Sequence, residues 1–317
     1  MDRYAATTTM TLLALIPASC TPDSEAPDGG DPATEPTPAV AEAPPGTDIW
    51  LAPLSRDEGG RLSIGEPVGA VQRPGYDNQP HFLPDGSGFW FTSIDDAGQA
   101  DIRYYDLATG RVDAVTTTAP ESEYSATPLE SGDGFSAIRV EADSTQRLWR
   151  FSMDGSGGEP VFESIAPVGY HAWADEETVV MFVLGQPATL QVGDVGSGQA
   201  RVVAEDIGRS IRRIPGSSQV SYVQRRGEGM SEIRRLFPET GESELLAEGV
   251  QGGDYHAWTP EGILLQAHGA RLYAWDPSVD DAVWEEIADL SALGIELTRL
   301  AVSPDGTTLA LVGEPTR

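Results

Sequence analysis

The feature that most constrains the fold is a repeat that runs through the chain from Asp48 onward. An apolar or proline residue precedes each predicted turn, and consecutive members of this series are separated by 41 to 46 residues: Phe82, Pro128, Trp173, Ile214, Trp258 and Val302. Between them lie short apolar runs, bounded by turns rich in Gly and Asp, which is typical of short strands. We find no 3.6-residue periodicity in this region, and parallel solenoids use shorter repeats.

The repeat that begins at Tyr76 shows the unit most clearly. Its first segment ends at the turn 84–86, and three further strand-like runs follow at 88–93, 101–107 and 111–116. Repeats of this length with four strands each are typical of β-propeller blades. The sequence therefore predicts an all-β propeller.

The last repeat is only half a unit. Residues 299–312 supply two strands, while 48–54 and 65–71 read as the third and fourth strands of a blade. We therefore predict a six-bladed β-propeller with four-stranded blades, the last blade shared between the N- and C-terminal segments. Such sharing removes an exposed sheet edge. Five or seven blades remain open if one repeat is misjudged.

The turns carry a family resemblance. Pro84-Asp85-Gly86 and Pro304-Asp305-Gly306 resemble the Pro-Asp-Gly turn of the WD-like repeats in the periplasmic TolB family, and 106–110 and 153–155 resemble that family's second hairpin turn. The resemblance covers nearly all of 48–317 and implies a TolB-like propeller, but it says little about function. The chain has no room for that family's N-terminal α/β domain, so TolB's own partner interactions are not carried over.

The first twenty residues read as an export segment. The apolar stretch 10–16 is too short to span a bilayer, and small residues precede the single cysteine, Cys20. This arrangement resembles a bacterial lipoprotein cleavage site, although Pro17 stands where Leu is usual. We predict a signal peptide at 1–19 and lipidation of Cys20; the alternative is a free buried cysteine. The chain would then be periplasmic or on the cell surface, at the outer membrane in a Gram-negative cell.

The next segment changes in composition. Residues 21–47 contain seven Pro and six acidic residues but no cation, and Val40 is the one large apolar side chain among them. Such a segment cannot bury enough surface to offset its ordering entropy. We predict a disordered acidic tether at 20–47 and a folded domain at 48–317.

Charge excludes several function classes. The chain has 50 acidic residues and 20 basic ones, all of them Arg, for a formal net charge of -30. Such a surface repels phosphate backbones, so we expect no nucleic-acid partner. Without Lys there is no phosphate-loop lysine and no Schiff base. The composition fits a saline habitat or simply genome composition with solubility.

One constellation of polar residues stands out. The tetrapeptide Tyr-His-Ala-Trp occurs at 170–173 and again at 255–258, at the same position of two repeats, and Arg212 falls at the equivalent place in the repeat between them. The segment that enters the innermost strand of a blade faces the axial channel, so these side chains would meet there. A pocket with His and Arg suits an anionic group. The predicted ligand-binding residues are Asn78, His81, Tyr170, His171, Arg212, Tyr255, His256 and Arg299.

Simpler interpretations stand beside this one. The tryptophans of the two tetrapeptides fit blade packing, and the histidines could satisfy neighbouring polar groups. A metal site at His171 and His256 would need more ligands. We find no nucleophile elbow, metalloprotease helix or calcium loop, so no catalytic residue, metal or cofactor is predicted.

These observations predict a non-catalytic binding module, lipid-anchored outside the cytoplasm. We expect a monomer that binds an envelope protein or a small anionic ligand at the axial funnel and meets the membrane only through its anchor. One alternative is a metal-assisted hydrolase or lyase that acts on a saccharide or lactone through the funnel histidines. Another is a non-catalytic envelope scaffold.

Overall fold

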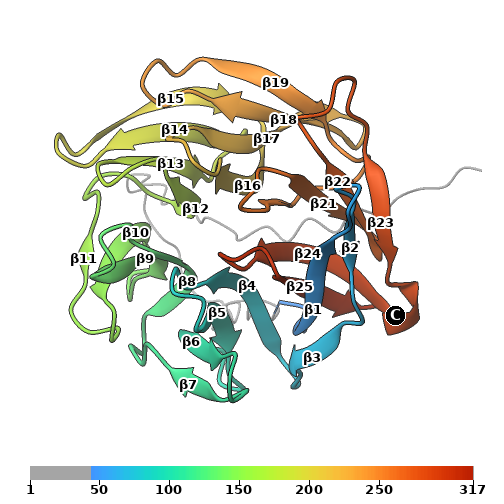
Figure 1. Ribbon diagram of the computed structural model, residues 1–317. Coiled ribbons are helices and arrows are strands. Elements are labelled where there is room, and N and C mark those ends of the chain that lie inside the picture. The colour runs from blue at the N-terminus through green and yellow to red at the C-terminus, as the bar shows by residue number, and fades with distance from the viewer. Residues whose placement is uncertain (1–43, 317) are drawn as a thin grey trace, which may run out of the picture. The chain divides into compact units, whose positions relative to one another are not determined.

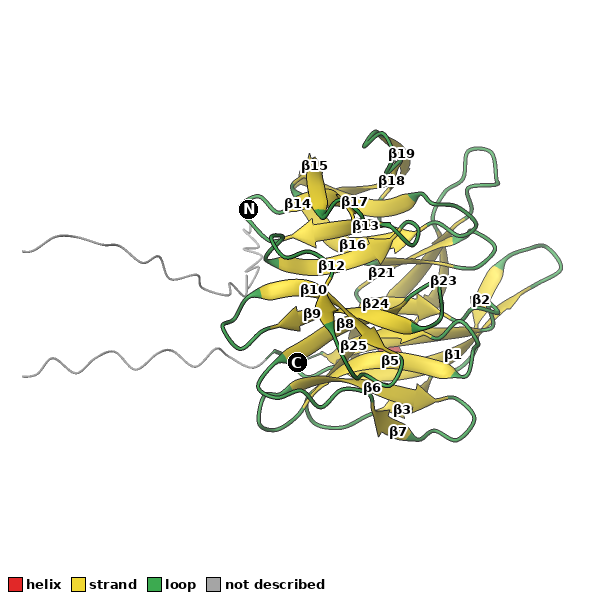
Figure 2. Cartoon of the chain, turned by 90° about the vertical axis from the view of Figure 1, so that its left-hand side faces the viewer, coloured by secondary structure: helices red, strands yellow, loops and turns green. Residues whose placement is uncertain are grey.

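The computed structural model describes residues 44–316, and the chain from Pro45 onward forms one compact unit. Six antiparallel sheets stand in a ring around a common axis, and each packs against the next (Figure 1). Figure 2 shows the ring edge-on, with the connecting loops on its two faces. The predicted signal peptide, Cys20 and most of the tether lie outside the described residues. No helix within 44–316 is long and apolar enough to cross a membrane.

The first five blades each use four consecutive strands. Blade 1 contains β4 (Tyr76–Phe82), β5 (Gly88–Ile94), β6 (Ala100–Asp106) and β7 (Val112–Ala114). Blade 2 contains β8 (Ser122–Pro128), β9 (Gly134–Val140), β10 (Gln146–Ser152) and β11 (Glu159–Pro160). Blade 3 contains β12 (Val168–Trp173), β13 (Thr178–Val183), β14 (Thr189–Asp194) and β15 (Gln199–Glu205). Blade 4 contains β16 (Ile207–Arg213), β17 (Val220–Gly227), β18 (Met230–Leu236) and β19 (Ser243–Glu248). Blade 5 contains β20 (His256–Trp258), β21 (Leu264–His268), β22 (Arg271–Trp275) and β23 (Glu285–Asp289).

Blade 6 is shared between the two ends of the domain, as predicted. It contains β24 (Ile295–Val302) and β25 (Thr308–Pro315), followed by β1 (Asp48–Arg56), β2 (Leu62–Ile64) and β3 (Val68–Val71); a 3-10 turn, η1 (Ser291–Leu293), precedes it. Trp50 pairs with Leu311 and Ala52 with Leu309, so β1 closes the ring against β25. The outer strand is shorter than predicted: it begins at Val68, and β2 pairs separately with the end of β1.

The core lies mainly between neighbouring blades. The second strand of blade 1, β5, carries Phe89, Trp90 and Phe91, all at most 2% exposed. The ring of Trp90 lies 4.9 Å from that of Phe135 in blade 2. Each such side chain contributes about 1.5–3 kcal/mol by leaving water. Burial between blades therefore holds the ring together and fixes the inner strands around the axis.

The Pro-Asp-Gly turns form as their residue types demand. Gly86 and Gly306 have φ of 72° and 71°, a left-handed conformation that glycine adopts without strain. The Asp85 carboxylate accepts the backbone N–H of Ser87, and that of Asp305 accepts the N–H of Thr307. The hydrogen bond from Ser87 lowers the pKa of Asp85, and those from the Ser303 hydroxyl and then the Thr307 N–H lower the pKa of Asp305. The turns link the first and second strands of blades 1 and 6, at one face of the ring.

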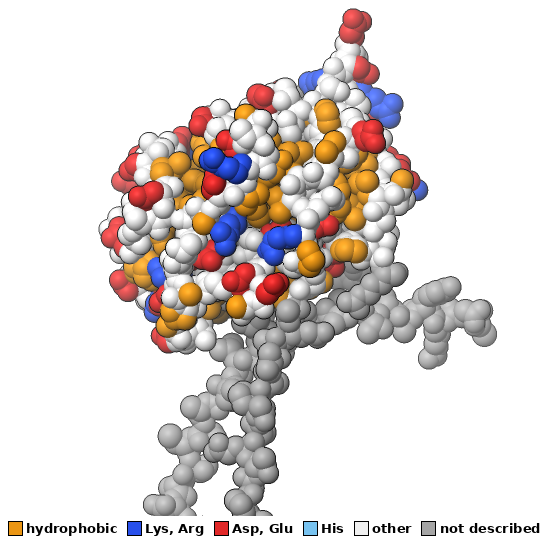
Figure 3. All heavy atoms as spheres, turned by 90° about the horizontal axis from the view of Figure 1, so that it is seen from below, with side chains coloured by type: hydrophobic (Ala, Val, Ile, Leu, Met, Phe, Trp, Pro, Cys, Tyr) orange, Lys and Arg blue, Asp and Glu red, His pale blue; other side chains and the backbone are white. Residues whose placement is uncertain are grey.

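The outer surface is mixed in character. Seen from below in Figure 3, apolar side chains lie among arginines and carboxylates. Val68 on β3 and Val112 on β7 are 67% and 44% exposed, and both belong to outermost strands.

Candidate functional site

One backbone hydrogen bond recurs in all six blades, and it shows which residues of the inner strands are structurally equivalent without any comparison of their sequences. In every blade, the residue after the inner strand donates its N–H to a carbonyl at the start of the second strand: Leu83 to Gly88, Leu129 to Gly134, Ala174 to Thr178, Ile214 to Gln219, Thr259 to Ile263 and Ser303 to Thr308. Counting back three residues from each donor gives one equivalent position, which we call the interface row: Pro80, Ala126, His171, Ile211, His256 and Leu300. All six are buried. The side chains of the interface row are therefore buried in the core of the protein.

The two histidines of the interface row bind the preceding blade. His171 Nε2 lies 2.7 Å from Ser136 Oγ on β9 of blade 2. His256 Nε2 lies 2.7 Å from Ser221 Oγ on β17 of blade 4. Each serine also accepts the indole N–H of the tryptophan two residues after the histidine, at 2.8 Å. The repeated tetrapeptide thus forms the same cross-blade cluster twice, and this accounts for its polar residues without a ligand.

The hydrogen-bond distances favour one histidine tautomer. The Ser136 hydroxyl is 2.7 Å from His171 Nε2 but 3.4 Å from the Thr127 carbonyl, and we assign its single hydrogen to the shorter contact. Nδ1 then carries the ring proton, and in both histidines this buried nitrogen has no hydrogen-bond partner within 44–316. Burial lowers the pKa of His171 and of His256 to about 3 each, so both rings are neutral at pH 7.

Arg212 lies one position away from the histidines. Arg212 lies two residues before the donor Ile214, and the equivalent residues in other blades are His81, Ala172 and Ala257. This position follows the interface row by one residue. The turn after β16 is one residue longer than the turn after β12, and Ile214, which continues the apolar series in the sequence, corresponds to Ala174 rather than Trp173. The equivalence of Arg212 with the two histidines was therefore wrong by one residue. Arg212 is half-buried, unlike the interface row.

A second group of predicted residues meets across the axis. Arg299 on β24 donates from Nη2 to the Tyr170 hydroxyl on β12, at 2.9 Å. Because β24 belongs to blade 6 and β12 to blade 3, which stand opposite each other in the ring, this bond crosses the axis of the ring (Figure 1). The Arg299 guanidinium also lies 4.3 Å from the centre of the Tyr255 ring, from blade 5. We call Tyr170, Arg212, Tyr255 and Arg299 the axial cluster.

The charges of the axial cluster have no carboxylate partner. Twelve of the 18 arginines in the described part of the chain form ion pairs with Asp or Glu; the six that do not are Arg103, Arg150, Arg201, Arg209, Arg212 and Arg299. Arg212 donates to the Ile211 carbonyl of its own strand, at 3.0 Å. Burial, and then the positive charge of Arg299, lower the pKa of Arg212 to about 10. Both guanidinium groups are therefore charged at pH 7 and uncompensated, in a protein of net charge -30.

The two remaining predicted residues differ in their surroundings. Asn78 is buried; its Nδ2 donates to Thr47 Oγ1 at 3.2 Å, and its Oδ1 accepts the N–H of Gln79. It therefore fastens the entering chain to blade 1. The side chain of His81 reaches solvent, but the surrounding protein removes much of its hydration. This desolvation, and then the positive charge of Arg212, lower the pKa of His81 to about 4. Because blades 1 and 4 stand opposite each other, His81 and Arg212 face one another along the channel.

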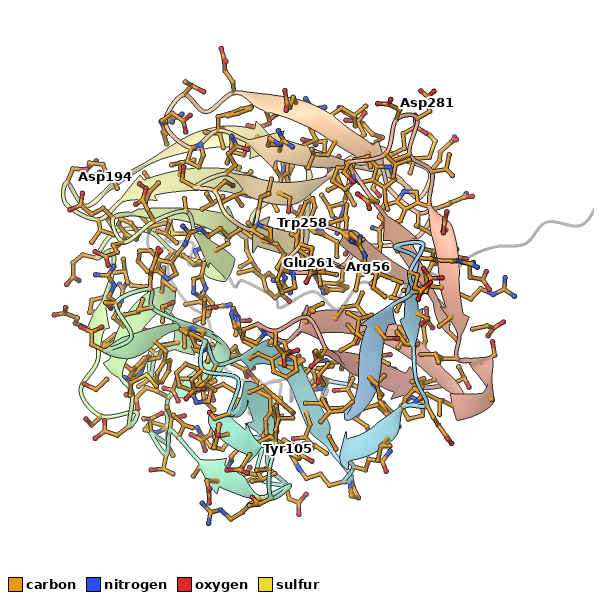
Figure 4. The ribbon with its side chains drawn as sticks, viewed as in Figure 1. Arg56, Tyr105, Asp194, Trp258, Glu261 and Asp281 are labelled. Carbon is orange, nitrogen blue, oxygen red and sulfur yellow. The ribbon has the colours of Figure 1, made fainter. Side chains whose placement is uncertain are left out.

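The mouth of the channel carries a carboxylate. Figure 4 shows Trp258 and Glu261 of blade 5 beside the central opening, whereas Tyr105, Asp194 and Asp281 lie toward the outer edge of the ring. Glu261 belongs to the turn that follows β20 and is exposed.

Two grooves lie away from the axis. One, of about 670 Å³, runs between the turns of blades 2 and 3, and the other, of about 490 Å³, between those of blades 3 and 4. None of the predicted ligand-binding residues lines either groove. Across residues 44–316, no three His, Cys, Asp or Glu side chains come together as a metal site requires.

Sequence reasoning missed the two serines. Ser136 and Ser221 each lie on the second strand of a blade, and each lies 35 residues before the histidine that it binds. This equal spacing is a signal that could have paired them with the tetrapeptides. The tyrosines were predicted on the tetrapeptide alone, but they contact Arg299 of a third blade, which no local pattern reports.

Comparison with known proteins identifies the fold. No protein-family model matches the chain, and no curated protein matches it in sequence. Among solved structures, a putative TolB from Agrobacterium tumefaciens matches 84% of this chain and 98% of its own, at a TM-score of 0.63 and 13% identity. TolB from Acinetobacter baumannii matches 85% of this chain at a TM-score of 0.55 and 12% identity, but the match spans only 65% of that protein. An oligogalacturonate lyase in complex with manganese matches 83% of this chain and 82% of its own, at 0.54 and 14%.

At these identities the likeness concerns the fold alone. The chain is a six-bladed β-propeller with TolB-like structural neighbours, among which enzymes also occur.

Proposed function

We propose that this protein is a non-catalytic binding module that takes an anionic ligand at the axial cluster. The observation that carries the proposal is the pair of guanidinium groups, Arg212 and Arg299, which come from separate blades and have no carboxylate partner among the described residues. Buried charges in proteins are normally paired, because an uncompensated one is costly. A bound anion would supply the missing charge.

The chemistry of the cluster suits a carboxylate. A guanidinium presents several N–H donors in one plane and binds carboxylates through two parallel hydrogen bonds. Arg299 uses Nη2 for Tyr170, and no hydrogen bond from its other nitrogens to the described protein is found. Tyr255 and Tyr170 hold its guanidinium in place by ring contact and hydrogen bond. A small acid or the C-terminal carboxylate of a partner protein would meet a preorganised site.

Ligand screening by thermal shift and calorimetry tests this proposal. The probes are D-galacturonate, D-glucuronate, succinate, isophthalate and a short peptide with a free C-terminus, each compared with its uncharged or amidated counterpart. We expect at least one anion to stabilise the parent protein and Arg299→Gln to lose the effect. Arg111→Gln is the matched control, because Arg111 is exposed and pairs with Asp113. Failure of every anion to bind at millimolar concentration would contradict the proposal.

We further propose that the protein is exported and anchored by a lipid on Cys20. The support is the sequence around Cys20, and the tether would space the propeller from the membrane. Fractionation of cells that express the parent or Cys20→Ala tests this: the parent should sediment with membranes, and the variant should not. Equal sedimentation of both forms would contradict lipidation.

A metal-assisted lyase is the competing function. It is favoured by one neighbour, the oligogalacturonate lyase in complex with manganese. However, the histidines that this function would use, His171 and His256, bind serines between blades. Incubation with polygalacturonate and Mn²⁺ decides between the two: new double bonds, seen by ultraviolet absorbance and lost in His171→Gln, would replace the binding proposal. A scaffold role would instead leave all anion probes without effect while membrane pull-downs retain a protein partner.

A further inference from the structure

We infer that the axial cluster selects ligands with two negative charges over ligands with one. This inference rests on the proposed function and adds the charge class of the ligand.

The axial cluster contains two cations that no acidic side chain of the described chain compensates. Arg212 projects from β16 of blade 4 and Arg299 from β24 of blade 6, and neither forms an ion pair within the described chain. A monoanion could neutralise only one of them. A dianion gives each guanidinium its own acid group.

The two arginines repel each other. Their charges interact, since Arg299 contributes to the lowered pKa of Arg212. No acidic side chain is among the groups that perturb Arg212; the others are Tyr255 and Tyr170. A monoanion that pairs with one arginine leaves the other without a counter-charge, whereas a dianion supplies a counter-charge to both.

The two cations are anchored separately. Arg299 is fixed by Tyr170 from blade 3 and by the Tyr255 ring from blade 5, and Arg212 is tied to its own strand at the Ile211 carbonyl. Each guanidinium is therefore held by contacts of its own, and the two come from separate blades. Two acid groups separated by a short spacer fit this arrangement better than one.

Calorimetry with size-matched probes tests the inference. Isophthalate is compared with 3-carbamoylbenzoate, and succinate with succinamate, so that each pair differs by one charge and hardly in shape. The full chain is titrated at pH 7 in about 0.15 M salt, where the long-range repulsion of the acidic surface is screened. We expect the dianion of at least one pair to bind at least tenfold more tightly than its monoanion.

Variants assign the preference to Arg212. Arg212→Gln should bind both members of that pair within about threefold of each other and at the parent's affinity for the monoanion. Arg212→Lys keeps the charge and should retain the preference, and Arg111→Gln is the control. Circular dichroism verifies that each variant is folded, and a misfolded Gln variant leaves the parent comparison decisive.

The outcomes separate the two proposals. If dianion and monoanion bind equally well to the parent, the inference is overturned while the proposed function stands. A dianion preference that persists in Arg212→Gln also overturns it, because the second charge is then read elsewhere. If no anion binds, the proposed function itself fails.

Discussion

The interface row and the axial cluster lie on the same inner strands, one residue apart, yet they treat polar side chains in opposite ways. His171 and His256 are buried, and each finds a serine on the preceding blade. Arg212 and Arg299 come from adjacent positions and find no carboxylate partner among residues 44–316. In the first region each histidine binds a serine through Nε2, although its Nδ1 has no partner among residues 44–316, and in the second region no acidic side chain compensates the charge. The difference teaches that a polar residue on an inner strand is structural or available to a ligand according to its register.

The largest expected effect comes from breaking the interface row. Ser136→Ala removes the acceptor of the Trp173 indole and the partner of His171, both at most 8% exposed. Two buried polar groups without partners should lower the free energy of unfolding by about 2–5 kcal/mol. Urea denaturation measures it. The exposed Ser63→Ala is the control, and a loss below about 0.5 kcal/mol would show that the cluster is not structural.

The second prediction concerns pH. The folded protein holds His171 and His256 neutral, with pKa values of about 3, whereas unfolded histidine has a pKa of about 6.5. The unfolded chain therefore binds more protons between these values, and stability falls as the pH is lowered from about 6.5. Each histidine contributes a slope of up to about 1.4 kcal/mol per pH unit.

Urea midpoints at pH 7, 6 and 5 measure this slope. His256→Gln should reduce it, and His268→Gln, at the exposed end of β21, should not. An unchanged slope in the His256 variant would contradict the role of burial.

The third prediction sharpens the contrast with the arginines. Arg299→Met removes an uncompensated, 8% exposed charge and replaces it with an apolar side chain of similar length. Because a buried unpaired charge is costly, the free energy of unfolding should rise, or fall by less than about 1 kcal/mol. Anion binding should be lost in the same variant. A loss of several kcal/mol would place Arg299 with the structural residues instead.

A smaller effect is expected from Tyr170→Phe. This change removes the hydroxyl that accepts from Arg299 but keeps the ring, which packs on Phe182 with centroids 5.8 Å apart. Loss of one hydrogen bond to a charged group corresponds to about 1.5–3 kcal/mol at most, and the Tyr255 ring still holds the guanidinium, so we expect anion affinity to fall severalfold. Calorimetry with isophthalate measures it. Unchanged affinity would show that Tyr170 does not position Arg299.

The smallest effect is kinetic. Glu261 lies beside the channel opening, and its charge repels an approaching anion (Figure 4). Glu261→Gln should raise the association rate about twofold at low salt and leave it unchanged at 1 M salt. Stopped-flow mixing measures both rates. An equal gain at both salt concentrations would point to a steric cause.

The sequence predicted the fold well because turn chemistry and strand patterning are local. The Pro-Asp-Gly turns, the six repeats and the blade shared between residues 48–71 and 295–315 all follow from patterns within single repeats, and the structure confirms them. The outer strand was overextended at Gly65, because β1 continues to Arg56 and takes β2 as a second partner.

The site was harder to predict because it depends on register and on contacts between distant blades. The turn after β16 contains one extra residue, which the sequence did not reveal because Ile214 continues the apolar series. The sequence alignment therefore shifted Arg212 by one residue relative to the two histidines. The partners of the histidines are serines 35 residues earlier, and Arg299 meets a tyrosine 129 residues away. Sequence pattern reported that polar residues approach the axis, but only the structure separates those that are satisfied from those that are not.

A crystal structure of the protein with isophthalate tests the central claim most directly. The account predicts the ligand in the channel, with one carboxylate on Arg212 and the other on Arg299 at about 2.7–3.2 Å, and with the serine contacts of both histidines unchanged. Isophthalate bound in the groove between blades 2 and 3, or bound in the channel to the histidines after they leave their serines, would contradict it.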